Sequence, residues 1–183
     1  QLGRTHRLVA AGEAGQLVRE GKYAEAEQRL ASVTDLFEGA DPTAQALIGR
    51  IRLEQGDTAA AMDALGRVVA IDENAYETNV TLAELAESRN DGARAAAALE
   101  RVMFIFPYEI EHHRRLAAAY AASGDHAKAV RERRAIVALR PVDRAEALYQ
   151  LGVALRDAGN RAEARTQVVR ALEVAPAFER AQE

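Results

Sequence analysis

The side chains best suited to metal binding in this sequence are its four histidines, His6, His112, His113 and His126. Adjacent positions on a helix point about 100° apart, so His112 and His113 cannot form the i, i+4 pair that commonly binds zinc. Glu109 and His113 do have that spacing. One carboxylate and one imidazole are an incomplete ligand set, however, so we interpret His113 as a packing residue and predict no metal site.

Acid–base chemistry could in principle use Glu84 and Glu87, which lie three residues apart. Such pairs are common on solvated helix faces, and neither a nucleophile nor a glycine-rich phosphate loop accompanies this one. The sequence contains no cysteine, which excludes disulfides, zinc–thiolate sites and thiol nucleophiles. We therefore predict no catalytic or cofactor-binding residues in this segment, and we predict that it is not an enzyme.

The elements that would position any functional residue are helices, as residues 148–176 illustrate. Leu151 and Leu155 are spaced four apart and so share one helix face. Gly159 interrupts the pattern, and a second apolar-periodic segment ends before Pro176, where a helix cannot easily continue. Neither helix can bury a core alone, so this helix–turn–helix unit is expected to stack against copies of itself.

Copies of the unit recur along the chain at steps of 34 or 35 residues. The turn position carries glycine or asparagine, which tolerate the left-handed backbone, at Gly21, Gly56, Asn90, Gly124 and Gly159. The first helix has a small residue in register at Ala14, Gly49, Ala83, Ala117 and Gly152. The second helix has alanine at Ala26, Ala61, Ala95, Ala129 and Ala164. Small side chains at both places allow the two helices of each unit to pack closely.

These columns resemble the tetratricopeptide repeat, a 34-residue pattern of an aromatic residue, Leu-Gly and Tyr on one helix, then Ala, Phe and a closing Pro. The closing proline is found at Pro107, Pro141 and Pro176. The chain departs from the pattern at Glu13, at Arg52 and at Arg133, which takes the large apolar place of the fourth unit.

The resemblance implies an all-α, right-handed α-solenoid of five tandem repeats in a single domain, 1–183. The expected repeats cover residues 7–41, 42–75, 76–109, 110–144 and 145–178, and 177–183 starts a further helix. The expected helix pairs are about 6–20 with 23–37, 43–55 with 58–71, 76–89 with 92–104, 109–123 with 126–139, and 142–158 with 161–174. Residues 38–42 form the longest gap, with Asp41 or Thr43 able to cap the next helix.

Composition limits the classes of partner and the setting. A net charge of −4 argues against a surface built for nucleic-acid backbones, and no apolar run approaches the length of a membrane span.

Arginine outnumbers lysine strongly, which indicates a GC-rich, bacterial source. The chain lacks an initial methionine and stops within a further helix, so we expect it to be part of a larger protein. The compartment stays open between cytoplasm and periplasm.

The resemblance also implies a concave wall lined by the first helix of each repeat. The wall positions that we expect to contact a partner are Arg50, Leu53, Glu84, Glu87, Arg114, Tyr149, Val153 and Arg156. An apolar beginning, an acidic middle and a basic, aromatic end would suit an extended peptide or a partner's helix. The alternative is that these charges only keep the face soluble.

Two subclasses of binding are disfavoured by particular residues. Repeats that grip the C-terminal carboxylates of chaperones use wall asparagines, and Arg50, Glu84 and Val153 stand at such places. Related RNA-binding repeats would be opposed by Glu77, Glu84 and Glu87, so we predict no nucleic-acid partner.

Three alternatives stay open. The segment could be the regulatory or assembly arm of an enzyme whose catalytic domain lies elsewhere. An outer patch at Phe104 and Phe106 is the rival contact surface. Uncapped ends of the array would also favour self-association.

Overall fold

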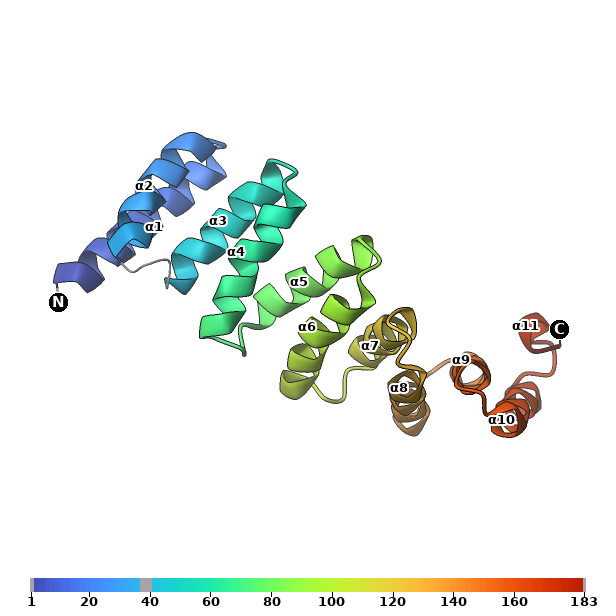
Figure 1. Cartoon of the computed structure of the whole chain (residues 1–183). Helices are drawn as coiled ribbons and strands as arrows, with labels where there is room; N and C mark the ends of the chain where they lie inside the picture. Colours follow the sequence, from blue (N-terminus) through green and yellow to red (C-terminus); the bar gives the residue numbers. More distant parts are fainter. Residues whose placement is uncertain (1, 37–40, 183) are drawn as a thin grey trace. The chain divides into compact units, whose positions relative to one another are not determined.

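The computed structural model describes residues 2–36 and 41–182, with side chains for 8–31 and 41–182. All regular structure in this part of the chain is helical (Figure 1). The helices are α1 (Leu2–Arg19), α2 (Tyr23–Leu36), α3 (Pro42–Glu54), α4 (Thr58–Ile71), α5 (Tyr76–Ser88), α6 (Gly92–Ile105), α7 (Ile110–Ala122), α8 (His126–Ala138), α9 (Arg144–Asp157), α10 (Arg161–Val174) and α11 (Glu179–Gln182). The predicted all-α repeat fold is confirmed.

The predicted helix boundaries hold to within two residues, with one exception. The first helix begins at Leu2, earlier than the expected start near residue 6. α9 begins at Arg144, two residues late, because Asp143 caps it: the Glu146 backbone N–H donates to the Asp143 carboxylate over 2.9 Å. Of the predicted gap at 38–42, residues 38–40 lie outside the described part. Asp41, not Thr43, is the cap of α3, since its carboxylate accepts from the Ala44 N–H.

The turn column has the backbone that its residue types predicted. Asn90 has a φ of 55°, and the four turn glycines have φ between 74° and 83°. The residue after the turn caps the next helix at Asp57, Asp91, Asp125 and Asn160. One position with positive φ was not expected. Arg140, which follows α8 and directly precedes Pro141, has a φ of 56°.

The chain divides into two compact units, residues 1–85 and 86–183, and the boundary falls within α5. In the first unit, α1, α2 and α3 share a core of Ala10, Ala14, Val18, Ala26, Leu30, Ala44 and Ile51. In the second unit, the core includes Val130, Leu151, Leu155 and Ala164. α7 packs on α8 and α9 on α10, as antiparallel helix pairs (Figure 1). The division into five repeats within a single domain stays a prediction.

The residues of the small columns are buried, as their predicted place at helix crossings requires. All five second-helix alanines are buried, and so are Ala14, Gly49, Ala83, Ala117 and Gly152. A Cβ atom added to Gly152 would lie 2.8 Å from Val168 Cγ2, which means that α9 and α10 cross too closely for a larger residue. Gly92 is tighter still, because its Cβ would lie 2.7 Å from the Ala119 carbonyl oxygen.

Candidate functional site

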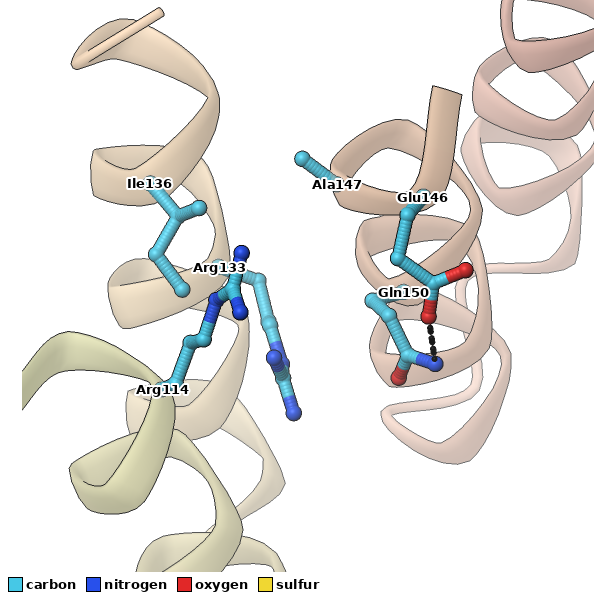
Figure 2. Close-up of a pocket in the computed structure, with 6 residues that line it drawn as sticks. All are labelled: Arg114, Arg133, Ile136, Glu146, Ala147 and Gln150. Atoms are coloured by element: carbon cyan, nitrogen blue, oxygen red, sulfur yellow. Dashed lines mark hydrogen bonds between the residues drawn. The ribbon is translucent and has the colours of Figure 1, made fainter. Parts of the chain in front are cut away.

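In the second unit, α7, α8 and α9 surround a pocket of about 280 Å³. Its lining residues are Arg114, Arg133, Ile136, Glu146, Ala147 and Gln150. Figure 2 shows the two arginine side chains close together on one side, with Glu146 and Gln150 across from them on α9. Arg114 is one of the predicted wall residues, and the structure places it in the lining of this pocket.

The two arginines occupy different environments. The Arg114 side chain is 45% exposed, and its Nη1 lies 3.8 Å from the Glu111 carboxylate. Arg133 is partly buried on α8 and makes no ion pair or hydrogen bond with any residue in the described part of the chain. Burial lowers the pKa of Arg133, the charge of Arg114 lowers it further, and Glu146 opposes both effects. An arginine stays charged at neutral pH regardless, so this pocket contains a charge that forms no ion pair with a described carboxylate.

The acidic residue of the pocket is engaged elsewhere. Glu146 Oε1 accepts a hydrogen bond from Gln150 Nε2 over 2.9 Å (Figure 2). Glu146 Oε2 pairs with Arg180 of α11. Both oxygens of Glu146 therefore have partners, and neither is Arg133.

α11 covers the neighbouring surface of α9. The rings of Tyr149 and Phe178 meet edge to face with their centroids 5.5 Å apart. The Arg180 guanidinium lies 5.5 Å from the Tyr149 ring centroid, a cation–π distance. Ala181 is buried. The predicted contact residue Tyr149 is thus already packed within the chain.

A second pocket, of about 360 Å³, lies between α6 and α7 beside the end of α5. Small apolar side chains form much of its lining, among them Ala95, Ala118 and Ala122. Glu87 stands at this pocket and accepts two hydrogen bonds from Arg115, each 3.0 Å long. Because Ala118 lies four residues after Arg114, each pocket has a lining residue on the same face of α7.

The remaining predicted wall residues are distributed over both units. In the first unit, Arg50 and Glu84 are exposed and Leu53 is half-buried. In the second, Val153 is half-buried, and Arg156 is 63% exposed and pairs with Asp157 at 2.9 Å. Their role as one binding surface stays a prediction.

Residue patterns missed Gln150, Arg180 and the role of Arg133. The sequence does contain a signal for Arg133 and for Arg180. Arg133 is a charge in a large apolar place of the repeat, and Glu146 and Arg180 are 34 residues apart, one repeat length.

His113, which the sequence led us to interpret as a packing residue, is held by polar contacts. His113 Nδ1 lies 2.7 Å from Glu132 Oε2, and Nε2 lies 3.0 Å from the Pro107 carbonyl oxygen. Glu109 precedes α7 as its N-terminal cap position. Within the described residues, no three His, Asp or Glu side chains are grouped to hold a metal ion.

No helix in the described ranges is long and apolar enough to cross a membrane.

Comparison with known proteins gives one family. Sequence models described as tetratricopeptide repeat match residues 17–76 and residues 145–178. None of the curated proteins matches the chain.

Solved structures with this fold include three that align over most of their length. MamA from Desulfovibrio magneticus RS-1, residues 41 to the end, is 18% identical with a TM-score of 0.57, covering 97% of each chain. A second MamA structure, AMB-1, is 18% identical with a TM-score of 0.64, covering 98% of each chain. YrrB, described as a tetratricopeptide repeat protein with an unusual peptide-binding site, is 18% identical with a TM-score of 0.64, covering 94% of this chain and 88% of its own.

Proposed function

Because this chain belongs to the tetratricopeptide repeat family, we propose that it is a protein-interaction scaffold that binds a peptide or a helix of a partner protein. The binding surface in the second unit is the face of α7 and α9 that carries Arg114, Val153 and Arg156. Tyr149 lies on the same helix as Val153 and Arg156, but its ring already contacts Phe178 and Arg180. In the first unit the corresponding residues are Arg50, Leu53 and Glu84.

The observation that carries this proposal is the pocket between α7, α8 and α9. It combines charged walls with the apolar side chains of Ile136 and Ala147. Interfaces depend most on residues that offer both hydrogen bonding and a large apolar body, and arginine and tyrosine are the common examples. YrrB, with its unusual peptide-binding site, gives a precedent for peptide binding within this fold.

We propose further that the segment binds rather than catalyses. His113, the most buried histidine among the described side chains, has both ring nitrogens occupied by Glu132 and Pro107, which leaves it no free atom for proton transfer. The net charge of −4 supports a protein rather than a nucleic acid as partner.

Affinity capture tests the surface. The wild-type chain, an Arg114→Glu/Arg156→Glu variant and an Arg165→Glu/Arg170→Glu control would each be used to capture proteins from the lysate of the source organism. The control makes the same charge change at exposed positions of α10. We expect one partner to be lost with the first variant and kept with the control. Loss of the partner with both variants would mean that net charge, not this surface, determines capture.

A second candidate binding surface is an exposed aromatic patch. Phe104 and Tyr108 are 81% and 80% exposed and Phe106 is 48% exposed, at the end of α6 and the segment that follows it. A Phe104→Ser/Phe106→Ser variant included in the same capture separates the two surfaces. If only this variant loses the partner while remaining fully helical, the aromatic patch is the binding site.

A further inference from the structure

We propose that the pocket of Arg114 and Arg133 binds a carboxylate of the partner, from a glutamate or aspartate side chain. This inference rests on the proposed function and names the chemistry by which the partner is recognised. Figure 2 shows the two arginines that would hold the carboxylate.

The first argument is the position of Arg133. Its side chain is partly buried and lines the pocket, where it has neither an ion pair nor a hydrogen bond to a described residue. Withdrawing a charge from water without a compensating group is costly, and a second cation, Arg114, adds repulsion. One carboxylate would offset both costs, because its two oxygens can accept hydrogen bonds from two guanidinium groups.

The second argument concerns the charges around the pocket. Glu146 is bound to Gln150 and Arg180, and Glu111 is 3.8 Å from Arg114. Neither acid approaches Arg133 to ion-pair distance. Among the lining residues, two arginines therefore face one carboxylate, Glu146, which leaves a deficit of one negative charge.

That deficit favours a carboxylate over a phosphate. A phosphate group carries about −1.5 to −2 at neutral pH, and Glu146 would repel it more strongly than a single negative charge. The size of the pocket agrees with this choice. At about 280 Å³ it is at the small end of ligand sites, and the side chains of Ile136 and Ala147 suit the methylene groups of one acidic residue.

The test uses the whole chain and three blocked tripeptides, acetyl-Ala-Glu-Ala-amide and the same peptide with glutamine or phosphoserine in the middle. Binding is followed by NMR through the Nε–Hε signals of the arginine side chains. We expect the glutamate peptide to shift the Arg114 and Arg133 signals, with a Kd on the order of 1 mM. The glutamine peptide should bind at least about ten-fold more weakly, since charge-assisted hydrogen bonds are lost.

Variants then assign the site. Arg133→Met keeps the apolar stem and removes the charge, and Arg114→Gln tests the exposed arginine in case the first variant folds poorly. Each should weaken binding of the glutamate peptide about ten-fold, whereas Arg170→Met on α10 should not change it.

Three results would overturn the inference: equal binding of the glutamate and glutamine peptides, unchanged affinity in both pocket variants, or phosphoserine binding about ten-fold tighter than glutamate. None of these decides the proposed function, because affinity capture with the Arg114→Glu/Arg156→Glu variant tests that separately. If a captured partner is lost with the Arg114→Glu/Arg156→Glu variant but is kept by Arg133→Met, the result supports the scaffold function and refutes the carboxylate site.

Discussion

His113 on α7 and Glu132 on α8 form a buried pair 19 residues apart in sequence, with their side chains 9% and 7% exposed. Nδ1 of the imidazole lies 2.7 Å from Oε2 of the carboxylate. The other carboxylate oxygen accepts a hydrogen bond from Arg131 Nε over 2.8 Å. This polar contact lies in an interface between two helices whose other buried residues are mostly apolar, such as Leu116 and Ile136.

A double-mutant cycle measures what this pair contributes. Each of His113→Phe and Glu132→Leu should lower the free energy of unfolding by about 2 kcal/mol, because each leaves a buried polar partner unsatisfied. The double variant should lose less than the sum of the two, since both polar groups are then replaced by apolar ones. Urea denaturation followed by circular dichroism gives all four values. Strict additivity would show that the two side chains do not interact.

Arg133→Leu should stabilise the free chain. The variant removes an uncompensated, partly buried charge from a place where the repeat has a large apolar residue, and a gain of about 1 kcal/mol is typical of such changes. For a chain of this size that corresponds to a rise in Tm of about 2–4 °C. Arg165→Leu, at an exposed position of α10, is the matched control and should change the stability by less than about 0.5 kcal/mol. A lower Tm for Arg133→Leu would mean that Arg133 stabilises the pocket.

Gly92→Ala and Gly66→Ala should have opposite effects. At Gly92 the new Cβ would meet the Ala119 carbonyl oxygen and the Ser123 backbone nitrogen, both at 2.7 Å, so α6 and α7 must separate. We expect a loss of about 1–3 kcal/mol from this overpacking. At Gly66, within α4, nothing lies within 4 Å of the new Cβ, and alanine should add up to about 1 kcal/mol through its helix propensity. Thermal melts of both variants check the pair, and equal Tm values would contradict the close crossing at Gly92.

Phe178→Ala should loosen α11. The substitution removes the edge-to-face contact with Tyr149 and the surface beneath Arg180, a loss of about 1 kcal/mol or more. Hydrogen exchange in α11 and on the adjoining face of α9 should become faster, and the Tm should fall by a few degrees. Phe104→Ala is the matched control because that ring is 81% exposed. If the exchange of α11 is unaffected, then Arg180 and Ala181 hold the helix without the ring.

Self-association through the ends of the array is a separate prediction, because an unpaired helix face at the end of a repeat array normally needs a cover. Sedimentation velocity over a range of concentrations measures it. In the C-terminal part, Val169 and Val174 are about half exposed, and they are the residues to change to glutamate if dimers form. A monomer at all concentrations would show that the ends need no further partner.

The sequence by itself determined the features that depend on local backbone geometry and on spacing. Asn90 could be assigned to a turn because it occupies the glycine column, and its φ of 55° agrees. The paired small columns could be assigned to helix crossings because period and register are properties of the chain alone. The place of Arg114 on the wall came instead from the resemblance to the repeat family, and its role there stays a prediction.

Only the tertiary structure decided which side chains meet across helices. Arg133 is a departure from the repeat pattern in the sequence, and only the fold places it beside Arg114 in a pocket that residues of α9 also line. Glu146 pairs with Arg180, which lies one repeat later in the sequence. His113 had a candidate partner at Glu109, yet its ring contacts Glu132 and Pro107. Such contacts depend on how two helices are rotated and translated against each other and on which rotamers fit between them, and a single helix pattern contains neither.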